Sequence, residues 1–246
     1  MTHNREASPC WLDPESPVPA FPDVDLAMQE PDGLLAVGGA LTTEWLLQAY
    51  RHGIFPWYGP GQPILWWAPD PRLVLYPGQL HVSRSLARVI RKGRYSVTLD
   101  TAFNEVVAAC AAAPRPGQSG TWITPEMHEA YVRFHHEGYA HSVECRYQGE
   151  LVGGLYGVAI GGIFFGESMF ARATDASKVA FVALVRQLVR WNFGLIDCQV
   201  HTDHLARMGA TAIPRQAFTA ILERECHTPG IVRPWIFDED ILRLSP

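Results

Sequence analysis

The sequence predicts an α+β fold, and the prediction depends on three features of its second half. Three strand-like runs come first, "AHSVECRY" (140–147), "ELVGGLYGVAI" (150–160) and "IFFGESMF" (163–170), separated by Gln148-Gly149 and Gly161-Gly162. Glycine-containing pairs between such runs are hairpin signals, so an antiparallel meander is expected. The segment "DASKVAFVALVRQLVRWNFG" follows and is apolar on nearly every side, which predicts a buried helix. Paired strands followed by a helix and the further strand "LIDCQV" are typical of an α+β domain.

Capping residues and helix breakers predict the other helices. Thr42 or Thr43 should cap a helix that Gly53 ends, and Ser83 a shorter one. Asp175 or Ser177 should cap the long helix, with Gly194 at its end. Further helices are expected over 102–113, 125–138, 202–209 and 215–226, and further strands over 95–100 and 210–214. The run 72–82 should be a strand and a turn, and residues 1–32 should be extended or loop.

Composition limits the classes of function. The 246 residues are 48% hydrophobic, enough for a full core, and the formal net charge of −5 disfavours nucleic-acid binding over the whole surface. No apolar run reaches the roughly 18 residues of a membrane span, and the polar N-terminus is unlike a signal peptide. Five widely spaced cysteines without a C-x-x-C pair fit a reducing, cytoplasmic setting and give no zinc site.

The stretch "GIFPWYGPGQPILWWAPDPR" (53–72) cannot form a regular helix, because it holds five prolines. Its Trp57, together with Trp122 and Tyr131 further along the chain, belongs to an unusually rich aromatic set. These rings could fill the core, or proline-stiffened loops could present some of them for a base to stack on.

The strand "LIDCQV" carries Asp197 and Gln199 two residues apart. Side chains at that spacing share one face of a strand, so the pair predicts either a solvated face or a polar pair at the mouth of a pocket. Glu167 and Ser168 end the strand-like "FFGESMF" and serve either as turn residues or, with Asp197, as an acidic site for a cationic ligand.

"HTDH" follows the strand and offers His201 and His204 as metal ligands, but no third ligand stands at a familiar spacing. Asp203 is therefore expected to cap the next helix, and no metal is expected.

Basic residues concentrate in "SRSLARVIRKG". Arg84, Arg88 and Arg91 recur at i, i+4 and i+7, and Lys92 adjoins them. The face is either simply solvated or, in an otherwise acidic protein, a site for phosphate groups.

These motifs together resemble the bacterial leucyl/phenylalanyl-tRNA–protein transferases. The resemblance runs in order through "EPDGLLAVGGAL", "GIFPWY", "PILWWAPDPR", "HVSRS", "GTWIT", "AHSVE", "LVGGLYGVA", "GESMF", "ASK", "LIDCQV" and "AIPRQAF". It implies a small N-terminal domain (1–72) followed by a domain similar to the GNAT acetyltransferases (73–246).

The resemblance also implies an activity. The family transfers leucine or phenylalanine from leucyl-tRNA or phenylalanyl-tRNA to proteins with N-terminal arginine or lysine, which marks them for degradation; methionine is a third candidate donor. The aminoacyl ester is already activated, so no cofactor is expected, and a monomer is the simplest expectation.

The family's site residues carry over by position. By the resemblance, Asp197 and Gln199 are the catalytic pair. Gln199 accepts a hydrogen bond from the attacking amine, and Asp197 fixes Gln199 and favours positive charge on that amine. Glu167 helps to bind the cationic acceptor. The aminoacyl pocket comprises Leu155, Met169, Phe181, Leu184 and Leu188; the adenosine site comprises Trp57, Trp122 and Tyr131; tRNA phosphates meet Arg84, Arg88, Arg91 and Lys92.

Two rival interpretations remain. A GNAT-type acetyltransferase needs a glycine-rich pyrophosphate loop before the long helix, where this chain reads "ARATDASKVA". A non-enzymatic RNA-binding module explains the arginines and aromatics, but not Asp197 and Gln199 beside a deep apolar helix.

Overall fold

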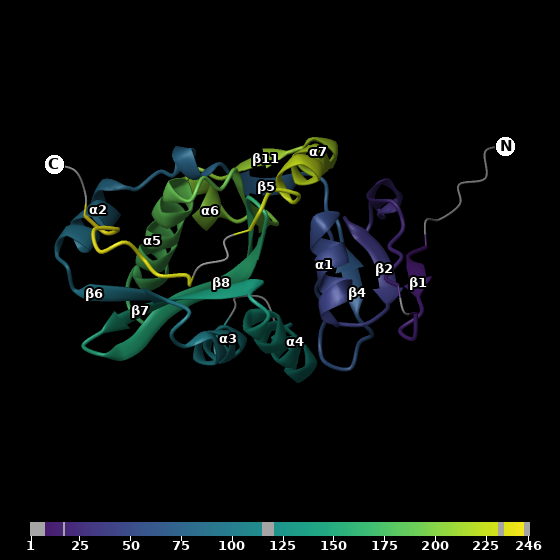
Figure 1. Cartoon of the computed structure of the whole chain (residues 1–246), viewed down its shortest axis with the longest axis horizontal. Coiled ribbons are helices and arrows are strands. Elements are labelled where there is room, and N and C mark those ends of the chain that lie inside the picture. The colour runs from purple at the N-terminus through teal and green to yellow at the C-terminus, as the bar shows by residue number, and fades with distance from the viewer. Residues whose placement is uncertain (1–7, 17, 115–120, 231–233, 244–246) are drawn as a thin grey trace.

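Two β-sheets organise the chain in the structure, a computed structural model that describes residues 8–16, 18–114, 121–230 and 234–243 (Figure 1). The smaller sheet has the order β1-β2-β4-β3, and the larger β11-β5-β10-β9-β8-β7-β6. The smaller sheet consists of β1 (Cys10–Leu12), β2 (Leu34–Gly38), β3 (Phe55–Pro56) and β4 (Leu65–Trp67). The larger consists of β5 (Arg72–Leu75), β6 (Tyr95–Leu99), β7 (Ala140–Tyr147), β8 (Glu150–Ile160), β9 (Ile163–Ala171), β10 (Leu195–Gln199) and β11 (Thr211–Ile213). The α+β prediction is confirmed.

The helices lie close to their predicted positions. They are α1 (Thr43–Arg51), α2 (Arg84–Arg91), α3 (Phe103–Ala112), α4 (Pro125–His136), α5 (Ala176–Arg190), α6 (Asp203–Arg207) and α7 (Arg215–Glu225), with short 3₁₀ turns at Val24–Leu26 and Pro77–Gln79. Thr42 caps α1 and Ser83 caps α2, each by accepting a backbone N–H with its hydroxyl. Residues 1–7 and 17 of the segment expected to be extended or loop lie outside the described residues; within the rest of it, β1 is paired with β2.

The meander β7-β8-β9 is antiparallel, as predicted. Gln148 and Gly149 both have positive φ, +51° and +87°, which is the backbone of a tight type I′ hairpin. Along β8 and β9, neighbouring residues point to opposite faces of the sheet. Leu155 and Phe164 join the core beneath α5, and Tyr156 and Phe165 join the core on the other side. The meander is therefore buried on both faces.

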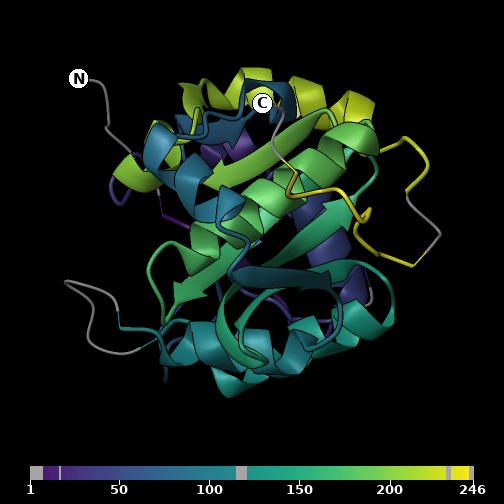
Figure 2. The same cartoon turned by 90° about the vertical axis from the view of Figure 1, so that its left-hand side faces the viewer.

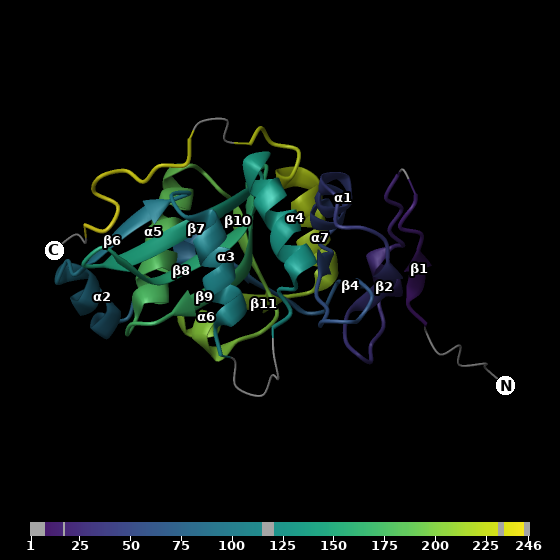
Figure 3. The same cartoon turned by 90° about the horizontal axis from the view of Figure 1, so that it is seen from below.

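Helices cover both faces of the larger sheet. α5 crosses one face, and α3 and α4 lie on the other, as Figures 2 and 3 show from two directions. α5 is buried, as predicted, but its end differs from the prediction. Gly194 does not end it: the helix stops at Arg190, and Asn192 adopts the left-handed conformation (φ +58°) that usually terminates a helix. Asn tolerates this conformation well, because its short polar side chain can bond locally.

The N-terminal elements share a core with the larger sheet. Tyr50 of α1 stacks near Phe134 of α4, with ring centroids 6.4 Å apart, and both rings are fully buried. Gly53 follows α1 with φ +75°, and a side chain there would meet Phe218 of α7 at 2.9 Å. α1, α4 and α7 therefore meet beside the larger sheet. The predicted division of the chain after residue 72 falls inside β5 and remains a prediction.

Candidate active site

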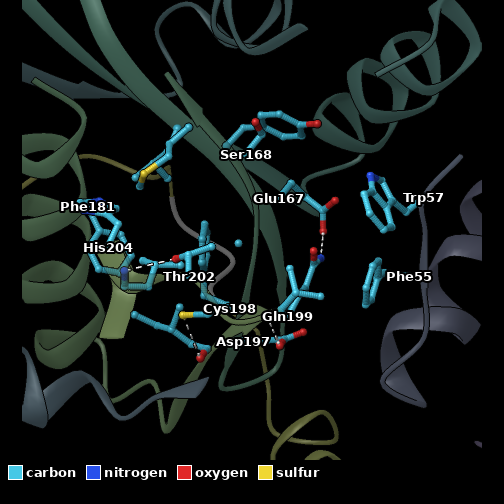
Figure 4. A pocket seen from close by; sticks show the side chains of 18 of the residues that line it. Phe55, Trp57, Glu167, Ser168, Phe181, Asp197, Cys198, Gln199, Thr202 and His204 are labelled. Atoms are coloured by element: carbon cyan, nitrogen blue, oxygen red, sulfur yellow. Dashed lines mark hydrogen bonds between the residues drawn. The ribbon is translucent and has the colours of Figure 1, made fainter. Parts of the chain in front are cut away.

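A cavity opens where two parallel strands separate. β10 pairs with β9 only from Leu195 (opposite Ile163) to Asp197 (opposite Phe165); beyond that point β9 continues against β8 alone. The cavity has a volume of about 400 Å³. Its lining comes from the separated ends of β9 and β10 (166–169 and 196–200), from residues 55–57, and from side chains of β8, α5 and α6 (Figure 4).

The structure brings most of the predicted site residues to this cavity. Those that line it are Trp57, Trp122, Leu155, Glu167, Met169, Phe181, Asp197 and Gln199. Its two ends differ in chemistry: Phe181 lies at one side, and Glu167 and Gln199 lie at the other, facing Trp57 (Figure 4). The cavity therefore joins an apolar end to a small polar group.

Three of the residues predicted for the aminoacyl pocket and the adenosine site do not line the cavity. Leu184 and Leu188 are fully buried in the core beneath α5, and Tyr131 is fully buried between α4 and β9. Leu184 and Leu188 share a helical stripe with Phe181, but they lie about 4.5 and 10.5 Å further along the helix axis. Of this stripe only Phe181, in the first half of α5, lines the cavity, and spacing alone could not show where along the stripe the cavity ends.

Asp197 forms a buried ion pair with Arg72, the first residue of β5. The Nε of Arg72 donates to one carboxylate oxygen at 2.8 Å and its NH2 group to the other at 2.7 Å. Both side chains are almost fully buried, at 1% and 0% exposure. The rings of Phe55 and Phe218 lie 4.8 Å from the guanidinium carbon. The interpretation of "LIDCQV" as a solvated face is therefore wrong, since all five residues of β10 are buried.

A β-bulge separates Asp197 from Gln199. The two residues face neighbouring residues of β5, Val74 and Leu73, so Cys198 has no partner there. Gln199 has a left-handed backbone (φ +61°), and its N–H donates to the Asp197 carboxylate at 2.9 Å. The expected shared face is lost, since strict alternation stops at the bulge. Asp197 turns to Arg72, and Gln199 turns to Glu167 (Figure 4).

Glu167 accepts hydrogen bonds from three elements. Gln199 donates to it through Nε2 at 2.9 Å, Tyr50 of α1 at 2.7 Å and Tyr131 of α4 at 2.9 Å. Burial raises the pKa of Glu167 to about 7, against the hydrogen bonds from the two phenols, which lower it. This carboxyl group therefore titrates near neutral pH.

Arg72 and Tyr50 are site residues that the sequence reasoning missed. Arg72 ends the motif "PILWWAPDPR", but its partner lies 125 positions away, and no local pattern connects the two. Tyr50 occurs on the apolar face of α1 beside Trp45, Leu46 and Ala49, and the local pattern does not distinguish it from them. A tyrosine among fully buried positions was the available signal, because a buried hydroxyl needs a partner.

Helix α6 begins within the "HTDH" segment. Thr202 caps α6 by accepting from the N–H of Leu205, so the prediction that Asp203 is the cap is wrong; Asp203 is the first helical residue. Within the described ranges, no three His, Cys, Asp or Glu side chains gather closely enough to hold a metal ion.

Comparison with known proteins shows the family. A family model described as "Leucyl/phenylalanyl-tRNA protein transferase" matches residues 74–223, and one for the N-terminal domain of the same proteins matches residues 39–70. The chain belongs to the leucyl/phenylalanyl-tRNA protein transferase family. A relative from Anaeromyxobacter sp. with this name is 63% identical over 220 residues, covering 89% of this chain and 92% of its own length. A second, from Alkalilimnicola ehrlichii, is 57% identical over 232 residues, with 94% and 90% covered.

One solved structure similar to this member of the leucyl/phenylalanyl-tRNA protein transferase family is a "GCN5-related N-acetyltransferase from Kribbella flavida". It is 16% identical, covers 66% of this chain and 58% of its own, and has a TM-score of 0.36. None of the described helices is long and apolar enough to cross a membrane.

Proposed function

We propose that this protein transfers leucine or phenylalanine from aminoacyl-tRNA to the N-terminal arginine or lysine of acceptor proteins, with methionine as a third donor. The observation that carries the proposal is the cavity between β9 and β10. Its apolar end, lined by Leu155, Met169 and Phe181, suits an unbranched or γ-branched hydrophobic side chain. Its polar end, at Glu167 and Gln199, suits an amine that attacks the neighbouring ester.

The chemistry requires positioning more than activation. An aminoacyl ester reacts with a neutral amine without ATP, and holding the two in line removes much of the entropic barrier. The Nε2 of Gln199 donates to Glu167, so its carbonyl oxygen remains to accept from the amine. Asp197 holds the backbone of Gln199, and Arg72 neutralises Asp197. Asp197 therefore contributes orientation of Gln199. The stabilisation of positive charge on the amine, which was expected of Asp197, is assigned to Glu167.

The terminal adenosine of the tRNA has an aromatic site at the mouth of the cavity. Trp57 lines this mouth and is 37% exposed. Its backbone is held on both sides: its N–H donates to Leu65, and its carbonyl accepts from the indole of Trp67 at 2.7 Å. Its ring packs edge-on against that of Trp67, with centroids 5.6 Å apart, which favours one orientation for stacking on a base. Trp122 lines the same cavity.

The acetyltransferase alternative is disfavoured by the start of α5. A pyrophosphate binds to the free N–H groups at a helix N-terminus, usually after glycines. Here Asp175 occupies the cap position, and its carboxylate bonds Lys178. An acidic residue at this point repels the phosphates of a thioester donor.

A transfer assay tests the proposal. Leucyl-tRNA or phenylalanyl-tRNA, labelled on the amino acid, is incubated with a peptide that begins with arginine, and matched peptides begin with lysine or alanine. Label should move to the first two and not to the third. Transfer from acetyl-CoA in place of aminoacyl-tRNA would support the acetyltransferase instead. The proposal also has the protein working as a monomer in the cytoplasm, which sedimentation and cell fractionation test.

The first prediction concerns the apolar end of the cavity. Phe181→Ala should increase transfer of bulkier donors, such as phenylalanine, relative to leucine by roughly 10-fold. Removal of the phenyl ring makes room for the larger side chain, and an apolar pocket separates hydrophobic side chains of slightly different size by about 1–3 kcal/mol. Leu184→Ala is the matched control. It should cost about 2–5 kcal/mol of folding stability and leave the donor ratio unchanged, because Leu184 is core and does not line the cavity. An equal ratio of phenylalanine to leucine transfer in the two variants would contradict the assignment of Phe181 to the aminoacyl pocket.

The second prediction concerns the exposed face of α2. Arg84, Arg88 and Arg91 are exposed, while Leu86 and Ile90 anchor the helix in the core. Changing all three arginines to alanine should weaken tRNA binding and flatten its salt dependence, because fewer counterions are released. Transfer from a short aminoacyl-adenosine donor should stay within about 2-fold, since this donor lacks the phosphates of the acceptor stem.

A second triple variant controls for net charge. Arg172, Arg224 and Arg243 are exposed in other parts of the chain, so their replacement by alanine removes the same charge. It should leave tRNA binding nearly unchanged. Equal weakening by the two triple variants would show that general charge, and not the α2 face, attracts the tRNA.

A further inference from the structure

Three oxygen-bearing side chains form a closed triangle behind the cavity. The hydroxyls of Tyr50 and Tyr131 are 2.5 Å apart, and they lie 2.7 and 2.9 Å from the two oxygens of Glu167. All three side chains are buried. Each phenol has a single hydrogen, so with Glu167 ionised two hydrogens must serve three contacts.

A third hydrogen on Glu167 satisfies every contact. The carboxylic acid then donates to Tyr131, Tyr131 donates to Tyr50, and Tyr50 donates to the other oxygen of Glu167. The triangle can thus hold either two or three protons without moving a heavy atom. This is the property required of a group that accepts a proton and returns it.

We propose that Glu167 takes the proton from the attacking amine, and that Tyr50 and Tyr131 hold it in a closed ring of hydrogen bonds until it passes to the leaving oxygen. The inference rests on the proposed transfer reaction and adds a proton path to it. It gives Glu167 a chemical role beyond attraction of a cationic acceptor.

The step balances without any further reactant. The amine nitrogen forms a bond to the ester carbonyl carbon and gives one proton to Glu167. The bond from that carbon to the ribose oxygen then breaks, and the ribose oxygen takes the proton back from Glu167. One C–N bond replaces one C–O bond, and the enzyme ends as it began.

The other polar groups of the cavity suit this role less well. Both oxygens of Asp197 already accept hydrogen bonds, from the Arg72 guanidinium and from the backbone N–H of Gln199. Gln199 is not a base near neutral pH. His204 lies across the cavity on the side of Phe181, away from Glu167 (Figure 4).

Protonation near neutral pH fits the surroundings of Glu167. Burial favours the neutral acid, the Tyr50 and Tyr131 hydroxyls oppose it, and the charge of Asp197 favours it; the pKa that results is about 7. Burial first, and the charge of Glu167 next, raise the pKa of each phenol well above its usual value, so both keep their hydrogens. Among the described residues, the titratable groups that act on the carboxyl are Tyr50 on α1, Tyr131 on α4 and Asp197 on β10. Tyr156 on β8 acts on the two phenols, and Arg72 on β5 pairs with Asp197.

The test is the pH dependence of transfer in a single turnover, with saturating acceptor. In the wild-type enzyme the rate should fall as the pH drops below about 7, because Glu167 becomes protonated and can no longer accept. Glu167→Gln should lower the maximal rate at least about 100-fold and leave only the titration of the amine itself. The fall in rate on the acidic side is the Glu167 limb of the pH–rate profile. Tyr50→Phe should move this limb to higher pH, because it removes a hydrogen bond that lowers the pKa of Glu167.

Tyr58→Phe is the matched control. Tyr58 is buried and bonds Thr124 at 3.3 Å, whereas Glu167 accepts from Tyr50, Tyr131 and Gln199, so removal of the Tyr58 hydroxyl should leave the pH dependence in place. A direct readout comes from NMR of protein labelled with ¹³C at the glutamate carboxyls. One carboxyl should titrate near pH 7, disappear in Glu167→Gln and titrate higher in Tyr50→Phe.

The outcomes separate the inference from the proposed function. A wild-type enzyme that transfers nothing at any pH overturns both. A Glu167→Gln enzyme that transfers within about threefold of the wild-type rate, or changes KM alone, overturns the inference and leaves the proposed function standing. If circular dichroism shows that Glu167→Gln is unfolded, the pH–rate profile of Tyr50→Phe decides. An acidic limb that stays at the wild-type pH overturns the inference.

Discussion

Arg72→Met should lower the free energy of unfolding by about 3–5 kcal/mol, because it leaves the Asp197 carboxylate buried without its partner. Asp197 is fully buried, and both side-chain N–H groups that donate to its carboxylate belong to Arg72. Methionine keeps the apolar contact with Phe55 and Phe218, since a thioether packs well against rings. The lost free energy of unfolding therefore measures the cost of burying the unpaired Asp197 carboxylate. Urea unfolding of the folded variant measures it.

The double variant Arg72→Met/Asp197→Leu separates stability from function. A buried ion pair replaced by apolar side chains is often no less stable, so most of the lost stability should return. Transfer should not return, because the backbone N–H of Gln199 has lost the Asp197 oxygen that holds it. A double variant as active as the wild type would show that the ion pair has only a structural role.

Arg190→Met is the control for the energy of an ion pair as such. Arg190 bonds Asp238 and Asp240 at the surface, where all three side chains are at least 39% exposed. Exposed ion pairs contribute little to stability, so this variant should leave the free energy of unfolding nearly unchanged. A loss as large as that of Arg72→Met would contradict the explanation from burial.

Local sequence signals predicted most of the fold. Caps such as Thr42 and Ser83 marked helix starts, and Gln148-Gly149 marked the hairpin of the meander. Each signal concerns residues within a few positions of one another, where hydrogen bonding and backbone geometry act directly. The end of α5 was misplaced, since Asn192 and Gly194 can both terminate a helix and only the packing of the chain selects between them.

The site itself could be predicted only in part. The family motifs placed Glu167, Asp197 and Gln199 together, but the contacts among them depend on residues from other elements. Glu167 meets Tyr50 and Tyr131 from helices 117 and 36 positions away. The bulge in β10 was also not visible, because the alternation of "LIDCQV" fits a regular strand. Tertiary contacts and local backbone conformation, more than residue type, decide how these groups act.

Gln199→Ala and Gln199→Gly should reduce the rate of transfer equally, by about 10²–10³-fold, because both remove an oriented amide that contacts the reacting amine. Their stabilities should differ. Gln199 has φ +61°, where a residue with a Cβ costs about 1–2 kcal/mol more than glycine. Gln199→Gly should therefore be the more stable of the two by about that amount, the reverse of the usual order in regular structure. Single-turnover kinetics and urea unfolding of both variants measure the two effects separately.

Gln199→Asn tests the reach of the side chain on the same backbone. Asparagine tolerates positive φ, so the turn after the bulge should form. Its amide is one methylene shorter and should fall short of Glu167, which now accepts from Nε2 of Gln199 at 2.9 Å. The rate should stay close to that of the alanine variant, although an amide is present. A rate near wild type for Gln199→Asn, or recovery of activity in Gln199→Gly alone, would show that the backbone conformation, and not the position of the amide, determines the rate.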